Sequence, residues 1–200
     1  YTNRGSVEGR YLCLTGVIID HESVERILKP KIIEIKKIFS DDPDELPVLH
    51  REDIVARKGV FAKLADPVIE KEFNEKYLEL IEILDYKICA VVLDKKEHLA
   101  KYQGAAFHPY HYCLTVLLER YVQQIKGVGV GDVMAEARGS VEDENLASEY
   151  EKFYNQGTHF MSCQTVQSVL TSRQIKIKNK KYQYAGLEFA DLLSLPTKLD

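Results

Sequence analysis

The chain of 200 residues is 45% hydrophobic and 29% charged, a composition typical of globular proteins that excludes a disordered chain. Its 27 lysines and arginines against 31 acidic residues give a net charge of −4, so bulk charge does not draw it to nucleic acid or to an anionic membrane. The longest unbroken apolar run, Ile88 to Leu93, is far shorter than the roughly 20 residues of a membrane-spanning helix, and we expect no membrane partner.

The cysteines predict free thiols and a cytoplasmic protein. None of the four forms a C-x-x-C pair, and most lie inside apolar segments, so reduced, buried thiols are favoured over a disulfide; they are Cys13, Cys89, Cys113 and Cys163. No charged-then-apolar signal peptide opens the chain. The first residue is Tyr1 rather than methionine, so the sequence is also compatible with a start inside a longer protein.

The first half of the chain alternates strands and helices. Residues 11–20 (YLCLTGVIID) are apolar and predict a buried strand. Apolar residues at helical spacing predict a helix over 23–39, which Pro30 kinks or divides. After the acidic loop 40–47, Asp66 and Pro67 are typical of a helix N-cap and first turn.

The second half continues this alternation. Residues 87–94 (KICAVVLD), apolar on both faces, predict a central strand covered by helices on each side. A helix follows His108-Pro109. Residues 128–137 predict a third strand that ends in Glu136 and lies in one sheet with the first two.

The last quarter carries three further local signals. Ser140 and Asp143 form a plausible capping box. The alternation in 174–184 predicts a hairpin or an edge strand. Residues 186–195 (GLEFADLLSL) predict a mostly apolar helix, so the whole pattern indicates an α/β or mixed-sheet domain.

Two motifs have the residue types of a phosphate-binding loop and of a metal site, but the neighbouring sequence disfavours both functions. The glycines of GVGVG (Gly127, Gly129, Gly131) follow a helix and precede a strand, the reverse of a phosphate-binding loop, so a turn is favoured. His108 and His111 share a helix face and could hold a metal, but without a third ligand nearby in sequence packing is favoured.

Asp191 is the most informative single residue. It lies in the apolar segment GLEFADLLSL, where a buried carboxylate costs several kcal/mol unless it is paired. One interpretation places it on a narrow polar side of the helix beside Glu188, facing solvent. The other makes it face a metal or a catalytic water.

Glu136 is the second candidate. It ends a predicted strand in MAEARG, and binding residues gather at strand ends in open α/β sheets. The alternative is an exposed acid paired with Arg138. Asp143, further along the chain, is explained by the capping box.

The basic stretch near the C-terminus also has two interpretations. Its lysines could bind phosphates, or they could protect an edge strand from aggregation; they are Lys176, Lys178, Lys180 and Lys181.

Several segments, in order, resemble the bacterial and phage family labelled domain of unknown function 3800. They are YLCLTGVII, LHRED, VFAKLAD, VVLDKKEH, PYHYCLTVLLER, MAEARGS and AGLEFADLLS, and they span nearly the whole chain. The resemblance implies a single ribonuclease-H-like α/β domain over residues 1–200, with a central mixed sheet flanked by helices.

The resemblance also implies a divalent-metal-dependent nuclease that hydrolyses phosphodiester bonds of DNA or RNA. Glu136 matches the strand acid and Asp191 the late-helix acid of such a site, and both would be catalytic and metal-binding. Two Mg²⁺ or Mn²⁺ ions about 3.5–4 Å apart would then align water and stabilise the leaving oxygen. His50 and Lys95 match family-typical positions without an assigned role, and Arg138 and Asp143 are further accessory candidates.

One departure from the family bears on the activity. Members usually begin with a strand that ends in an Asp-Glu-Ser-Gly-like motif, which supplies the first catalytic acid, whereas YTNRGSVEGR resembles the loop after that strand. We therefore expect the first strand to lie outside this sequence. The alternative to a nuclease is a non-catalytic ribonuclease-H-like module that binds nucleic acid or a protein partner.

Overall fold

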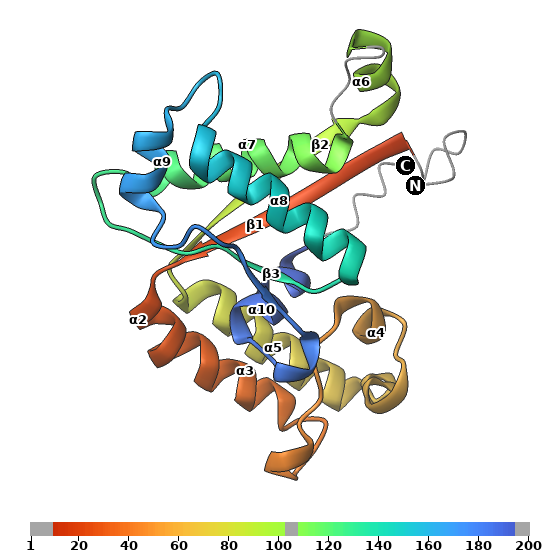
Figure 1. Ribbon diagram of the computed structural model, residues 1–200. Coiled ribbons are helices and arrows are strands. Elements are labelled where there is room, and N and C mark those ends of the chain that lie inside the picture. The colour runs from red at the N-terminus through yellow and green to blue at the C-terminus, as the bar shows by residue number, and fades with distance from the viewer. Residues whose placement is uncertain (1–9, 103–107, 195–200) are drawn as a thin grey trace. The chain divides into compact units, whose positions relative to one another are not determined.

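A computed structural model describes residues 10–102 and 108–194 of the chain (Figure 1). The fold is mixed α/β, mostly helical, with two small sheets. The described chain divides into two compact units. Unit 1 comprises residues 10–16, 88–102 and 108–178, and unit 2 comprises residues 17–87 and 179–194.

The boundary between the units falls inside two strands. These are β1 (Tyr11–Ile19) and β2 (Tyr86–Asp94), which pair with one another in a two-stranded sheet. Both strands form where the apolar sequence pattern predicts them.

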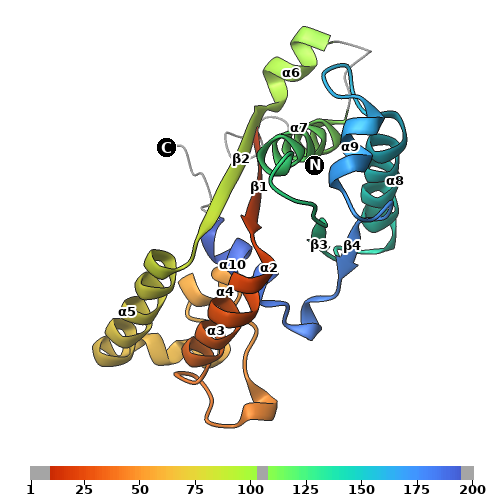
Figure 2. The same cartoon turned by 90° about the vertical axis from the view of Figure 1, so that its left-hand side faces the viewer.

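Besides the ends of β1 and β2, unit 2 consists of helices and helical turns. In chain order they are α2 (His21–Ser23), η1 (Val24–Leu28), α3 (Lys29–Lys36), η2 (Pro43–Glu45), α4 (Arg51–Val55), η3 (Gly59–Ala65), α5 (Pro67–Ile83), η5 (Lys180–Tyr182) and α10 (Ala185–Leu193). Within this unit α3 packs against both α5 and α10 (Figures 1 and 2).

Pro30 divides the helix predicted over 23–39, and the division is a change from π-helix to α-helix. The turn before it, η1, is a π-helix, and α3 starts with Pro30 in its first turn. Because proline has no N–H to donate, the hydrogen-bond ladder is interrupted there, and the N–H of Lys29 bonds to the carbonyl of Val24 instead.

An N-cap residue fixes the point at which α5 begins. The Asp66 carboxylate accepts a hydrogen bond from Val68 N–H at 2.8 Å, and Pro67 occupies the first helical position. The core that α5 helps to enclose contains Leu28, Ile35, Leu80 and Phe189, all fully buried. Tyr86 meets Phe189 edge-on, with ring centroids 5.1 Å apart.

Unit 1 combines helices with a second sheet. Its elements besides the strand ends are α6 (Lys95–Tyr102), α7 (Pro109–Ile125), β3 (Met134–Glu136), α8 (Ser140–Gln156), α9 (Cys163–Val169) and β4 (Lys176–Lys178). The helices α7, α8 and α9 pack together around Val122, Tyr150 and Val166 (Figure 2).

The predicted three-stranded sheet is wrong. In the described residues β3 pairs with β4, in parallel, with Ala135 opposite Ile177, whereas β1 pairs with β2. The predicted strand over 128–137 is also shorter, because before Met134 the segment has only an isolated bridge at Gly131. The segment 174–184 accordingly supplies a strand, not a hairpin.

Two other expectations need correction. The strand β2 is not covered on both faces, because Ile88 and Val92 are 50% and 49% exposed. The predicted capping box does not form, because the N-cap of α8 is Gly139, at φ 139°, which has no side chain to accept a hydrogen bond. Asp143 still caps the turn, because its carboxylate accepts the N–H of Arg138 at 2.8 Å.

The glycine segment, the cysteines and the helix lengths bear on three further expectations. The GVGVG segment begins with a turn, in which Gly127 has φ 82° and the N–H groups of Val128 and Gly129 both donate to the carbonyl of Ile125 at 3.0 Å. All four cysteines are free, but only Cys113 is buried as predicted; Cys13, Cys89 and Cys163 are partly exposed. Among the described residues no helix is both long enough and apolar enough to cross a membrane.

Candidate functional site

The predicted site residues divide between the two units. Unit 2 holds His50, Lys180, Lys181 and Asp191; unit 1 holds Lys95, Glu136, Arg138, Asp143, Lys176 and Lys178. Glu136 and Asp191 thus belong to different units, and the prediction that they share one site stays a prediction.

Unit 2 brings His50 and Asp191 together. The Nε2 atom of His50 lies 3.9 Å from Asp191 Oδ2, and the side chains are 28% and 32% exposed. On its other side His50 Nδ1 lies 3.1 Å from Asp53 Oδ2. The imidazole is therefore flanked by two carboxylates and remains open to solvent.

Asp191 is neither a freely solvated acid nor the partner of an arginine side chain. Its Oδ2 accepts the backbone N–H of Arg51 at 2.9 Å, and the Arg51 guanidinium donates to the carbonyl of Leu192 at 3.1 Å. These contacts bind the start of α4 to the end of α10. They explain how an aspartate is accommodated in an apolar helix.

Glu188 corrects the expectation that both acids of the last helix face solvent. It is 5% exposed and forms a buried ion pair with Lys36, with Nζ 2.8 Å from Oε1. The same Oε1 accepts the N–H of Leu49 at 2.8 Å. The other carboxylate oxygen is buried and has no hydrogen-bond partner.

Lysines and His50 together set the electrostatics at Asp53. The hydrogen bond from His50 lowers the pKa of the Asp53 carboxyl, partial burial opposes this, and the charges of Lys58 and Lys180 lower the pKa further. Lys58 Nζ lies 3.7 Å from Asp53 Oδ1. The carboxylate that orients His50 is thus held ionised by surrounding positive charge.

The candidates of unit 1 have other surroundings. The guanidinium of Arg138 lies 5.6 Å from the ring centroid of Tyr110. Lys176 forms an ion pair and a hydrogen bond with Asp132. Glu136 ends β3 as predicted.

Lys95 begins α6, directly after Asp94. Asp94 bonds to Arg10, whose Nε donates to Oδ2 at 2.7 Å. Its second oxygen caps α6 by accepting the N–H of Lys96 at 2.9 Å. The pairing with Arg10 lowers the pKa of the Asp94 carboxyl.

The predicted binding of Mg²⁺ or Mn²⁺ stays a prediction. No group of three or more His, Cys, Asp or Glu side chains among the described residues is arranged to hold a metal ion. In unit 2 the oxygen of Asp191 nearest to His50 is already hydrogen-bonded to Arg51.

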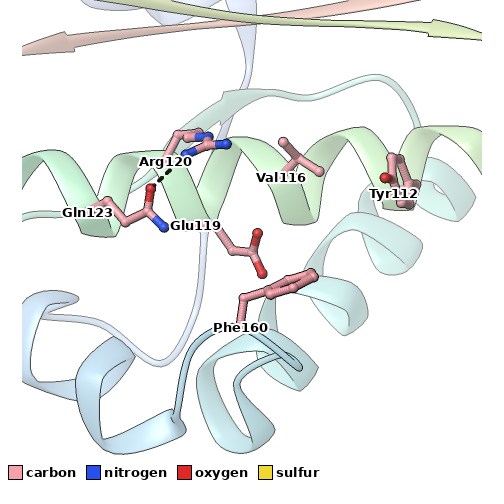
Figure 3. A pocket seen from close by; sticks show the side chains of 6 residues that line it. All are labelled: Tyr112, Val116, Glu119, Arg120, Gln123 and Phe160. Carbon is pink, nitrogen blue, oxygen red and sulfur yellow. Dashed lines mark hydrogen bonds between the residues drawn. The ribbon is translucent and has the colours of Figure 1, made fainter.

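A hollow of about 380 Å³ lies in unit 1 beside α7; it is lined by Tyr112, Val116, Glu119, Arg120, Gln123 and Phe160 (Figure 3). Figure 3 shows the Glu119 carboxylate turned toward Phe160, while Arg120 donates to Gln123 at 3.0 Å. Glu119 also accepts a hydrogen bond from Thr158. None of the predicted site residues lines this hollow.

Sequence reasoning missed two residues of the unit 2 site. Asp53 could have been found, because it stands three residues after His50 at a helix start, where such pairs share a face. Glu188 gave no local signal, since its partners Lys36 and Leu49 are distant in sequence.

No protein-family model matches this sequence, and neither curated proteins nor solved structures show significant similarity to it.

Proposed function

We propose that this protein hydrolyses phosphodiester bonds of nucleic acid, with His50 and Asp191 at the reacting bond. The observation that carries the proposal is the 3.9 Å approach of His50 Nε2 to the Asp191 carboxylate on a half-exposed surface. Both residues were singled out from sequence, and they meet although they lie on different elements, the N-cap of α4 and the last turn of α10.

The arrangement supports proton transfer. Hydrolysis needs a base that takes a proton from water and an acid that returns one to the leaving oxygen, and histidine is the most common side chain in these roles. A neutral His50 that donates its Nδ1–H to Asp53 presents Nε2 as the proton acceptor. Asp191, held by Arg51 N–H, then lies where it can bind the attacking water.

Positive charge near this site supports phosphate binding. Lys58 Nζ lies 3.7 Å from Asp53 Oδ1, and the positive charges of Lys58 and Lys180 both lower the pKa of the Asp53 carboxyl. A phosphodiester carries one negative charge at neutral pH, so these lysines would offset the two carboxylates beside His50. Dependence on Mg²⁺ or Mn²⁺ rests on the family resemblance alone and is tested separately.

The test is a cleavage assay with the whole chain on single- and double-stranded DNA and RNA, each with Mg²⁺, with Mn²⁺ and with a chelator. Cleavage that falls at least 100-fold in His50→Gln and persists in His159→Gln supports the proposal, since one acid–base group contributes about 100- to 10,000-fold. His159 is an exposed histidine of unit 1 and serves as the matched control. Equal cleavage by wild type and His50→Gln contradicts it.

A second candidate function is non-catalytic binding of nucleic acid. It is favoured by Tyr182, which is 64% exposed, with Lys181 Nζ 5.0 Å from its ring centroid. Exposed aromatic rings next to basic side chains are typical stacking surfaces for unpaired bases. Salt-dependent binding that Tyr182→Ala weakens, in a protein that cleaves nothing, would favour this function over hydrolysis.

A further inference from the structure

The segment that carries His50 is held by both acids of α10. Glu188 Oε1 accepts the N–H of Leu49 at 2.8 Å, and Asp191 Oδ2 accepts the N–H of Arg51 at 2.9 Å. The two carboxylates stand one helical turn apart and bond to the residues immediately before and after His50. Rotation of the backbone at His50 is thereby restricted on both sides.

A buried network supports the Glu188 side of this arrangement. Lys36 Nζ forms an ion pair with Glu188 Oε1 at 2.8 Å and donates a hydrogen bond to Gln183 Oε1 at 2.6 Å. Gln183 in turn donates from Nε2 to the carbonyl of Leu46 at 2.9 Å. The network therefore contacts the segment 46–49 at both of its ends.

Several features of this network are energetically unfavourable for folding, which indicates a role other than stability. Lys36 and Glu188 are 3% and 5% exposed, and the second oxygen of Glu188 is buried without a partner. Gln183 adopts a left-handed backbone conformation, with φ 51°. Buried ion pairs are often replaceable by apolar residues without loss of stability, so they contribute little as stabilisers.

We propose that Glu188 is a positioning residue that sets the orientation of His50, with Lys36 and Gln183 holding the Glu188 carboxylate in place. This inference rests on the proposed function and deepens it. The hydrogen-bond acceptor at Leu49 N–H is the essential feature. The charge of Glu188 serves to bind Lys36.

Two matched double variants separate the acceptor from the charge. Lys36→Met with Glu188→Gln removes both charges and keeps an oxygen for Leu49 N–H. Lys36→Met with Glu188→Leu removes both charges and also the acceptor, at similar side-chain volume. Any difference between the two reports on the hydrogen bond to Leu49 alone.

The first readout is the NMR signal of the His50 imidazole, assigned by its loss in His50→Gln. We expect the Gln double variant to retain the wild-type signal and the Leu double variant to shift it. In the cleavage assay we expect the Leu double variant to lose on the order of 100-fold in kcat with little change in KM, because small displacements of reacting groups have effects of this size. The Gln double variant should restore kcat.

A wild-type signal for His50 in a folded Leu double variant overturns the inference. Should that variant fail to fold, hydrogen exchange of the wild-type protein decides: the Leu49 amide must be protected, and rapid exchange of that amide overturns the inference. The NMR and exchange measurements do not require cleavage. A protein that cleaves no nucleic acid would therefore refute the proposed function and leave the positioning of His50 open to independent test.

Discussion

The imidazole of His50 lies 3.9 Å from the carboxylate of Asp191, and the two residues are joined more firmly through the backbone than through their side chains. Asp191 accepts the N–H of Arg51, the residue next to His50. The aspartate therefore both borders the imidazole and fixes the chain that bears it. A substitution that keeps the hydrogen bond but removes the charge can distinguish these two roles.

Asp191→Asn is that substitution. The asparagine side-chain oxygen can still accept the N–H of Arg51, so we expect the fold and the melting temperature to change little. Loss of the negative charge beside His50 should lower the rate of cleavage by about 100-fold or more. Asp85→Asn, at an exposed aspartate of the same unit, is the control and should cleave as wild type does. A variant that melts many degrees lower would instead identify Asp191 as a structural residue.

The pair of His50 and Asp53 predicts a specific pH dependence. The hydrogen bond from His50 lowers the pKa of the Asp53 carboxyl in the folded protein below its ordinary value of 3.8. Its contribution to stability is therefore fully present above about pH 4 and is lost as the pH falls through the lowered pKa. A carboxyl titration by NMR should give a midpoint below 3.8 for Asp53, and His50→Ala should raise that midpoint. An Asp53 midpoint that is the same in both proteins would contradict this geometry.

Features that depend on neighbouring residues were predicted well from sequence. Asp66 caps α5 because its side chain reaches an N–H two residues ahead, which the order Asp-Pro already indicates. The helix around Asp191 likewise forms at Ala185–Leu193, close to the predicted 186–195. Such features need no knowledge of the remaining fold.

Features that depend on distant partners were not predicted. β3 pairs with β4 in parallel, and nothing in the short sequence MAE specifies that partner. Glu188 is buried because Lys36, far away in sequence, neutralises it. His50 and Asp191 were each identified as candidates, but their meeting depends on the packing of α10 against the segment before α4.

Tyr150 offers a test of the core of unit 1. Its buried hydroxyl donates to the carbonyl of Ser172 at 2.9 Å, and burial raises the pKa of this phenol. Tyr150→Phe leaves that carbonyl without its donor and should lower the free energy of unfolding by about 1–2 kcal/mol. Tyr150→Ala also creates a cavity and should cost about 3–5 kcal/mol.

Urea unfolding of both Tyr150 variants measures these differences. Tyr182→Phe is the matched control, because its ring is 64% exposed, and it should stay within about 0.5 kcal/mol of wild type. A Tyr150→Phe protein as stable as wild type would show that the hydroxyl contributes nothing at this position.

The cysteines predict an order of chemical modification. Cys113 on α7 is fully buried, and burial raises its pKa to about 11. At pH 8 only roughly one thiol in a thousand is then ionised, and the thiolate is the reactive form. Cys163 begins α9 and is half-buried. In the native protein we expect iodoacetamide to modify Cys163 before Cys113, with rates that differ by on the order of 100-fold, because Cys113 reacts only through opening of the core.

Mass spectrometry of timed samples gives both rates, and the difference should vanish in denaturant. Equal rates in the native protein would show that α7 does not shield Cys113 as its burial implies.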